Sequence, residues 1–222
     1  MLKAILWDND GVLVDTEHLY FLATQRTLES VGISLTQEMY VDLFLTKAIG
    51  AWHLAEAKGY SDDDIARLKA KRNAFYLESL QAGVTAIDGI EAVVKELHAR
   101  YLMGIVTSSH REPFEAVHRS TGLLRYFAFS LTSEDYNNYK PDPEPYLLAI
   151  ARTGFRPDQC IAIEDSWRGL TSATAAGLRC IVVPRGFTRA GSFPGAHKIL
   201  SDVRDIPAAI EEAAAESPLK HR

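Results

Sequence analysis

The chain has 222 residues, of which 47% are hydrophobic and 24% are charged. That length exceeds one minimal domain and falls short of two, so we expect one main domain with a smaller insert. The composition excludes a disordered, collagen-like or low-complexity chain. The formal net charge of −5 gives no general attraction to nucleic acid or to an anionic membrane, so neither is expected as a partner.

Cysteines and apolar runs bear on the cellular compartment. Cys160 and Cys180 show no metal-ligand spacing and suit a reducing environment. Residues 1–10 run directly into two acids, unlike the long apolar stretch of a secretory signal. No apolar run approaches the ~18 residues of a membrane span. We therefore expect a cytoplasmic protein. Its expected oligomeric state is a monomer or a weak homodimer.

Four short apolar runs, each ended by polar residues, predict buried β-strands at 3–7, 102–106, 161–163 and 181–183. The runs are continuous rather than alternating, as in a parallel sheet that is covered on both faces. Helical patterns lie between them, at 90–97, from Pro143 to Gly154, and from Ser166 to Gly177. This alternation predicts an α/β domain with right-handed crossovers.

The stretch 16–86 interrupts that alternation, because it contains helical patterns and no convincing strand. Ser61 precedes three aspartates and marks a helix start, since acids favour the positive end of the helix dipole. We therefore predict a Rossmann-like core formed by 1–15 and 87–222, with an inserted helical domain at 16–86. The C-terminal stretch 211–222 has the pattern of a fraying, mobile helix end.

Chemically active side chains follow the predicted strands at their carboxyl ends, where ligands bind in open α/β sheets. A lysine in a Tyr-Lys-Pro-Asp-Pro loop adds a positive charge that can reach the same edge. The residues are Asp8 and Asp10 after the first strand, Thr107 after the second, Glu164 and Asp165 after the third, and the loop residue Lys140.

Such a gathering of carboxylates is self-repelling unless cations are present. Oxygen ligands without cysteine or histidine suit Mg²⁺ rather than Zn²⁺. Mg²⁺, an ammonium, a hydroxyl and backbone N–H groups together suit a phosphoryl group. A carboxylate can attack phosphorus to form an aspartyl phosphate. A phosphoryl group is therefore the ligand expected at this edge of the sheet.

Each candidate also has a structural interpretation when it is taken alone. Residues 8–11 have the composition of a turn, and Thr107 fits a helix cap. Lys140 alone would be a solvated surface lysine, and 164–166 would be an acidic helix start. Arg168 follows the acids and either reaches the substrate or, as we favour, is solvated. The seven histidines show no ligand spacing and are expected mostly at the surface or partly packed.

Four segments, in this order, resemble the motifs of the haloacid dehalogenase superfamily. They are Asp8-Asn9-Asp10-Gly11, the apolar strand that ends in Thr107-Ser108-Ser109, Lys140-Pro141, and the strand that ends in Glu164-Asp165-Ser166. Within the superfamily the chain most resembles the β-phosphoglucomutase-like phosphatases, which carry a helical cap between the first two motifs. The insert 16–86 lies at that place. The resemblance implies a Mg²⁺-dependent phosphatase with a Rossmann-like core and a helical cap, and a small phosphorylated metabolite, such as a sugar phosphate, as its substrate.

The resemblance also implies roles for the acids. Asp8 would be the nucleophile that becomes phosphorylated, and Asp10 would be the general acid and then the general base. The metal would be held by the Asp8 carboxylate, the Asp10 backbone carbonyl and the Asp165 carboxylate. Glu164 would lie in the outer coordination sphere.

Three further residues would handle the phosphoryl group. The resemblance implies that Thr107 and the N–H of Ser108 hold phosphoryl oxygens, near a helix start. Lys140 would neutralise charge on the nucleophile and on the phosphoryl group.

The insert would select the substrate by closing over the site. Mutases of this subgroup resemble one another in a histidine shortly after the first motif, and Tyr20 stands there in this chain. That departure favours a phosphatase, with a phosphosugar mutase as the alternative. Lys47 or Lys58 is a candidate for contact with an anionic substrate, and Lys47 would be the Schiff-base lysine of a phosphonate hydrolase. A catalytically idle binding protein is disfavoured, since every proposed catalytic position holds a competent residue.

Overall fold

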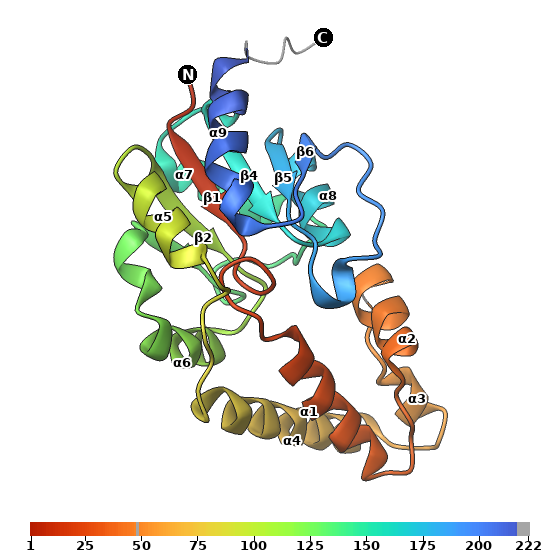
Figure 1. Ribbon diagram of the computed structural model, residues 1–222. Helices are drawn as coiled ribbons and strands as arrows, with labels where there is room; N and C mark the ends of the chain where they lie inside the picture. The colour runs from red at the N-terminus through yellow and green to blue at the C-terminus, as the bar shows by residue number, and fades with distance from the viewer. Residues whose placement is uncertain (48, 217–222) are drawn as a thin grey trace. The chain divides into compact units, whose positions relative to one another are not determined.

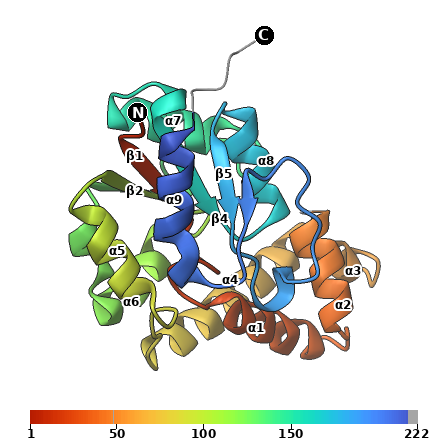
Figure 2. The same ribbon diagram turned by 45° about the horizontal axis from the view of Figure 1, so that its top comes forward.

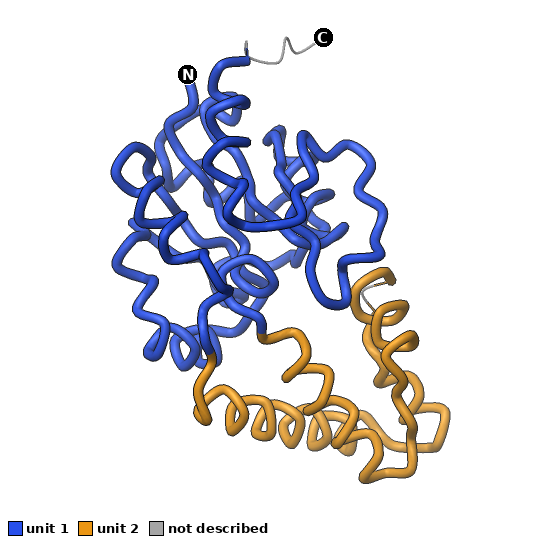
Figure 3. Tube along the Cα trace, in the orientation of Figure 1, with its two compact units in different colours: residues 1–15, 85–222 blue, residues 16–84 orange. Residues whose placement is uncertain are grey.

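The computed structural model describes residues 1–47 and 49–216, and two views of it are given in Figure 1 and Figure 2. The chain divides into two compact units (Figure 3). Residues 1–15 and the chain from 85 onward form the first unit, and residues 16–84 form the second. The sequence pattern suggested 16–86 for the insert.

Six strands of the described chain form one sheet in the first unit, in the order β3-β2-β1-β4-β5-β6. All neighbouring pairs are parallel, as the continuous apolar runs predicted. The strands are β1 (Ala4–Trp7), β2 (Leu102–Val106), β3 (Phe129–Leu131), β4 (Cys160–Glu164), β5 (Arg179–Val182) and β6 (Lys198–Ile199). The predicted α/β class is thus confirmed.

Two strands escaped the sequence analysis, and both are short. β3 is the three-residue segment Phe-Ser-Leu, and β6 is the dipeptide Lys-Ile at one edge of the sheet. Neither contains a run of apolar residues long enough to separate it from a loop. Their strand conformation comes from pairing with β2 and β5, which is tertiary information.

The helices of the first unit cover both faces of the sheet. α5 contacts α9 and α7 contacts α8, and the two pairs lie on opposite faces (Figure 1, Figure 2). These helices are α5 (Ile90–His98), α6 (Arg111–Thr121), α7 (Glu144–Thr153), α8 (Trp167–Ala175) and α9 (Ile206–Ala215). Four 3₁₀ turns complete the described part of the unit: η2 (Leu123–Tyr126), η3 (Pro157–Gln159), η4 (Gly186–Thr188) and η5 (Val203–Asp205).

The predicted helix boundaries in this unit are confirmed. α7 ends at Gly154, whose φ of 72° gives the left-handed cap that glycine adopts at low cost. α8 begins after Ser166, whose hydroxyl accepts a hydrogen bond from the Gly169 N–H. Of the predicted C-terminal helix end, α9 extends to Ala215, and residues 217–222 lie outside the described residues.

The core of the first unit follows from the strand pleat. Successive residues of β1 are all buried and point to alternate faces, so both faces of the sheet are covered. Ala4 and Leu6 belong to the apolar cluster that also contains Tyr146 of α7 and Leu170 of α8. Each fully buried aliphatic side chain of this kind contributes ~1.5–3 kcal/mol relative to an exposed one. This packing holds the strand ends, and the side chains that follow them, in fixed positions.

The described residues of the second unit form helices joined by turns and loops, without a β-strand. Its helices are α1 (Glu17–Glu29), α2 (Gln37–Tyr40), the π-helical turn η1 (Val41–Thr46), α3 (His53–Glu56) and α4 (Asp62–Gln81). α1 packs along α4. The predicted start of α4 is confirmed by a capping box, in which Ser61 and Asp64 each accept from the other's backbone N–H. Among the described residues, none of the helices is both long and apolar enough to cross a membrane.

Candidate active site

The parallel register of β1 with its two neighbours brings the candidate residues together. Trp7, the last residue of β1, pairs with Ile105 of β2 and with Ile163 of β4. Asp8 follows directly and donates its backbone N–H to the Ile163 carbonyl, at 2.9 Å. Thr107 follows β2 at the same edge, where Glu164 is the last residue of β4 and Asp165 follows it. The site therefore lies at the carboxyl edge of the sheet, as expected for this topology.

Lys140 lies at the centre of the site and is buried. Its ammonium donates to Asp8 Oδ1 at 2.7 Å, to Glu164 Oε1 at 2.7 Å and to the Val106 carbonyl at 2.8 Å. These three acceptors match the three N–H donors of an ammonium group. The interpretation of Lys140 as a solvated surface lysine is therefore wrong.

Charge in this cluster is unbalanced toward the negative. Burial and, next, the Glu164 carboxylate raise the pKa of Asp8 to about 8, although the Lys140 ammonium opposes both effects. Burial alone would lower the pKa of Lys140, but the carboxylates of Asp8 and Glu164 outweigh it and raise that pKa above its usual value. The ammonium is thus held charged, and the acids around it favour a second cation.

Glu164 is fully buried and is held from several directions. Besides Lys140, the Tyr146 hydroxyl donates to its Oε1 at 2.7 Å, and the Asp165 N–H donates to its Oε2 at 3.2 Å. Helix α8 passes so close that a Cβ at Gly169 would fall 1.8 Å from the Glu164 carboxyl carbon. A residue without a side chain is therefore required at 169, and Glu164 is locked in one position.

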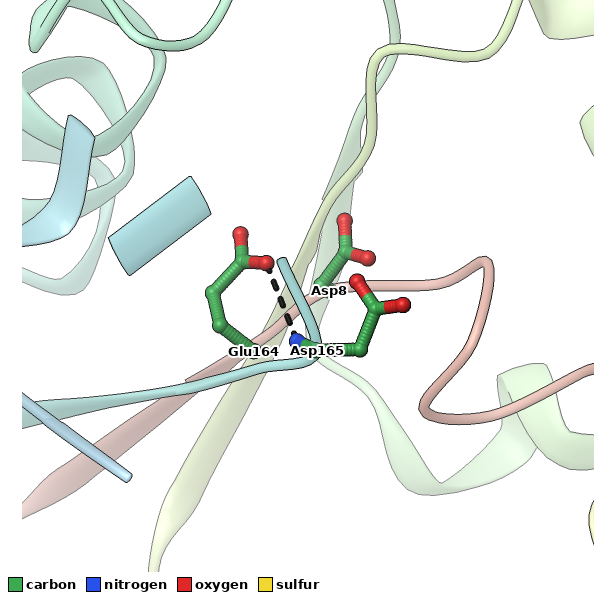
Figure 4. Close-up of side chains that lie close together, drawn as sticks. All are labelled: Asp8, Glu164 and Asp165. Atoms are coloured by element: carbon green, nitrogen blue, oxygen red, sulfur yellow. Dashed lines mark hydrogen bonds between the residues drawn. The ribbon is translucent and has the colours of Figure 1, made fainter. Parts of the chain in front are cut away.

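Three carboxylates lie within reach of one metal ion. Asp8, Glu164 and Asp165 each offer an oxygen, and these atoms lie within 4.8 Å of one another. Figure 4 shows the Asp8 and Asp165 carboxyl groups beside each other, with Glu164 on the other side of the Asp165 backbone. Thr188 donates to Asp165 Oδ2 at 3.2 Å, and a Cβ at Gly11 would fall 2.2 Å from that oxygen. An all-oxygen, negatively charged and preoriented set of this kind fits Mg²⁺.

Asp10 lies beside this cluster, and its Oδ2 accepts three hydrogen bonds. The donors are Ser109 Oγ at 2.8 Å, Asn9 Nδ2 at 3.2 Å and Thr107 Oγ1 at 3.3 Å. Thr107 Oγ1 also accepts from the Ser109 N–H, at 3.0 Å. Thr107 thus accepts a local backbone hydrogen bond, as a capping residue would, and it also donates to a candidate catalytic acid.

The structure places the remaining candidates less centrally. Ser108 is half-buried and follows Thr107 at the end of β2. Arg168 is also half-buried, and its Nε is buried without a hydrogen-bond partner among the described residues. The expectation of a freely solvated Arg168 is therefore wrong for that atom.

Several residues that shape the site were missed in the sequence. Asn9 and Ser109 had a visible signal, because each is a polar residue adjacent to a motif position at a buried strand end. Tyr146 and Thr188 had none, since they reach Glu164 and Asp165 from 18 and 23 positions away. His118 is buried, although most histidines were expected at the surface or partly packed.

The candidate ligands in the second unit make contacts within that unit. The Tyr20 hydroxyl accepts a hydrogen bond from the Arg72 guanidinium, which also lies over the Tyr20 ring. Lys47 forms a 2.6 Å ion pair with Asp42, and both side chains are about half exposed. Lys58 donates to a backbone carbonyl. A solvated, ion-paired lysine is not a Schiff-base nucleophile, which needs a neutral amine, so Lys47 does not support a phosphonate hydrolase.

The fold and the site together define an enzyme class. A parallel α/β sheet carries paired acids, a buried lysine and hydroxyl donors at its carboxyl edge, and a helical unit is inserted after the first strand. The model of the haloacid dehalogenase-like hydrolases matches residues 5–183. The chain belongs to this family, and the resemblance of its four motifs is confirmed.

Known proteins similar to the chain include two curated relatives and a solved structure. Protein CbbY of Rhodobacter capsulatus is 31% identical, covering 98% of this chain and 99% of its own length. The phosphorylated carbohydrates phosphatase of Thermotoga maritima is 31% identical, covering 81% and 84%. A structure of CbbY from Rhodobacter sphaeroides in complex with xylulose-(1,5)bisphosphate has a TM-score of 0.80 and 27% identity, covering 92% and 96%.

Proposed function

We propose that this enzyme is a Mg²⁺-dependent phosphatase that removes phosphate from a small phosphorylated sugar. The observation that carries the proposal is the buried ion cluster, in which Lys140 joins Asp8 to Glu164 and Asp165 lies alongside. The sugar is supported by the relatives, since one is named for phosphorylated carbohydrates and the solved structure contains a sugar bisphosphate.

In the first step a carboxylate oxygen of Asp8 attacks phosphorus. A bond forms between that oxygen and phosphorus, and the bond from phosphorus to the sugar oxygen breaks. Asp10 gives its proton to the departing sugar oxygen, which leaves as the alcohol. In the second step a water attacks the phosphorus of the aspartyl phosphate, Asp10 takes the water proton, and Asp8 is released with inorganic phosphate.

The metal site is proposed to use three of the acids at the sheet edge. The Asp8 and Asp165 carboxylates and the Asp10 backbone carbonyl would hold Mg²⁺, which supplies charge to stabilise the phosphoryl oxygens. Glu164 has hydrogen bonds to Lys140 and Tyr146, so it is proposed to fix the lysine, and it would take part in metal binding from the outer coordination sphere.

The phosphoryl group would be held by residues at the end of β2 and by Lys140. The Thr107 hydroxyl and the Ser108 N–H are proposed to donate to phosphoryl oxygens. Lys140, already hydrogen-bonded to Asp8, would offset the charge that develops on nucleophile and phosphoryl group. The positive charge thus lies beside the reacting atoms before the substrate arrives.

The helical unit 16–84 is proposed to be the cap that selects the sugar. A cap of this kind excludes bulk water, so that the aspartyl phosphate is attacked by a water that Asp10 activates. We further propose a cytoplasmic location and a monomer or weak homodimer, on the sequence grounds given above.

The test is a panel of phosphorylated sugars, assayed for free phosphate with Mg²⁺ and with a chelator. We expect release of phosphate that needs Mg²⁺ and is abolished in Asp8→Asn, with a phosphorylated wild-type protein detected by mass spectrometry after rapid quenching. An isomerised sugar phosphate without free phosphate would identify a mutase instead. Activity retained in folded Asp8→Asn would refute the nucleophile.

A further inference from the structure

Asn9 occupies an unusual place, between the proposed nucleophile and the proposed general acid. It is 1% exposed, so both ends of its amide need hydrogen-bond partners inside the protein. Its Nδ2 donates to Asp10 Oδ2 at 3.2 Å. Its Oδ1 lies 2.7 Å from Nε2 of His118, a residue of α6 that is 109 positions away. A buried amide thus connects a buried imidazole to Asp10.

The hydrogen bonds of this group run in one direction. Because a carboxylate oxygen only accepts, the NH₂ end of Asn9 must face Asp10, and its carbonyl end must face His118. His118 Nε2 must then carry the ring proton. Burial lowers the pKa of His118 to about 4, so the ring is neutral near pH 7 and carries one proton only.

The other ring nitrogen has a partner that fits this tautomer. His118 Nδ1 lies 2.9 Å from Thr121 Oγ1 and must accept the hydroxyl proton. The Thr121 oxygen in turn accepts from the Leu123 N–H, at 3.3 Å. Each hydrogen bond from Leu123 to Asp10 thus has one donor and one acceptor, and reversal of the Asn9 amide would place a carbonyl oxygen against the carboxylate.

We propose that Asn9 and His118 are positioning residues for Asp10, acting through the hydrogen-bond chain Thr121–His118–Asn9. The inference rests on the proposed function of Asp10 as general acid and base. Thr107 and Ser109 approach Oδ2 from the end of β2, while Asn9 brings a third donor that α6 holds in place. When the Thr107 hydroxyl turns to a phosphoryl oxygen, the donors from Ser109 and Asn9 remain on Oδ2 and fix the orientation of the carboxyl group, on which general acid catalysis depends.

The kinetic test compares two esters that differ in their leaving group. kcat/KM is measured with Mg²⁺ for p-nitrophenyl phosphate and for phenyl phosphate, whose leaving group is the poorer and needs the proton of Asp10 more. In Asn9→Leu we expect kcat/KM for phenyl phosphate to fall about tenfold more than for p-nitrophenyl phosphate. A change confined to stability would lower both values equally.

Variants of His118 distinguish its role in positioning Asp10 from its role in core packing. His118→Leu should shift the ratio of the two esters as Asn9→Leu does. His118→Gln keeps an N–H that can reach Asn9 Oδ1, so it should restore most of the wild-type ratio. The double variant Asn9→Leu/His118→Leu removes both partners of the buried Asn9–His118 hydrogen bond, so neither is left without its partner. It should fold and keep the shifted ratio of kcat/KM for the two esters.

Thr153→Val serves as a matched control. It removes the hydrogen bonds that the Thr153 hydroxyl donates to the Ile150 carbonyl and accepts from the Phe155 N–H, near the start of β4, at the edge of the sheet opposite the site. We expect it to lose stability without any change in the ratio of the two esters.

Two outcomes would overturn the inference. In the first, Asn9→Leu and His118→Leu keep the wild-type ratio of kcat/KM for the two esters, while Asp10→Asn loses activity. Asp10 would then still be the general acid, but Asn9 and His118 would not position it. The other is an Nδ1-protonated His118 ring, read from imidazole ¹⁵N shifts of the Mg²⁺-loaded protein. If instead Asp10→Asn retains wild-type values for both esters, the proposed function of Asp10 fails, and the two failures are thereby distinguished.

Discussion

Lys140 and Asp8 lie 132 positions apart in the chain, yet the lysine Nζ is 2.7 Å from the aspartate Oδ1. The same ammonium bonds Glu164, so one cation connects the ends of β1 and β4. Both ionic contacts are almost completely shielded from solvent. Surface ion pairs are worth little, but removal of one partner from a buried pair leaves an uncompensated charge.

Lys140→Met should therefore remove activity and also destabilise the fold. We expect a loss of about 3–5 kcal/mol in the free energy of unfolding, because two buried carboxylates would lose their cation. Denaturant titration at pH 7 measures it. Lys95→Met, at an exposed position of α5, is the control and should change stability by less than about 0.5 kcal/mol. Equal stability of the two variants would contradict the structural role of the buried pair.

Gly169→Ala tests the close approach of α8 to Glu164. Alanine favours a helix over glycine by about 1 kcal/mol, so propensity alone predicts stabilisation. The added Cβ would overlap the Glu164 carboxyl group at 1.8 Å, and the overpacking costs about 1–3 kcal/mol. We expect the clash to prevail, with lower stability and reduced turnover.

Thr174→Ala, on the exposed side of the same helix, isolates the propensity effect. It should leave phosphatase activity unchanged, since its hydroxyl donates to backbone carbonyls of its own helix and lies on the exposed side. Thermal melting of both variants provides the comparison. A Gly169→Ala protein as active and as stable as wild type would show that Glu164 has room to move.

The sequence predicted much of the sheet and the acids at its edge, for one physical reason. Strands buried on both faces are continuous apolar runs, so residues such as Asp8 and Thr107 are marked by where the runs end. β3 and β6 carry no such pattern, because only pairing with a neighbour defines them. The burial of Lys140 was also unpredictable alone, since its three acceptors come from three different segments.

Removal of the metal should lower the stability of the protein, because an ion that binds only the folded state stabilises it by mass action. Mg²⁺ at a hundred times its Kd adds ~2.7 kcal/mol, and a chelator should reverse the resulting rise in Tm. Asp165→Asn should weaken Mg²⁺ binding at least about tenfold, as measured by titration calorimetry, and should therefore reduce the rise in Tm by about half or more. Glu115→Gln, an exposed acid on α6, is the control and should bind Mg²⁺ like wild type. Wild-type affinity in Asp165→Asn would exclude this carboxylate as a ligand.

His118 should make the stability of the first unit depend on pH. Burial lowers its pKa from 6.5 to about 4, so between these values the unfolded chain binds a proton that the folded chain does not. Unfolding is therefore favoured as the pH falls. The free energy of unfolding that the neutral ring contributes is complete above pH 6.5 and is lost progressively as the pH falls to about 4. A tenfold difference in proton affinity between the folded and unfolded chain is equivalent to about 1.4 kcal/mol.

Denaturant titrations across this pH range, on wild type and His118→Gln, measure the effect. The glutamine has no proton to gain, so the variant should lose less stability than wild type between pH 6.5 and pH 4. Carboxylates elsewhere titrate in both proteins and cancel in the difference. Parallel pH profiles for the two proteins would mean that His118 titrates alike in the folded and unfolded chain, which contradicts a neutral, buried ring that donates to Asn9.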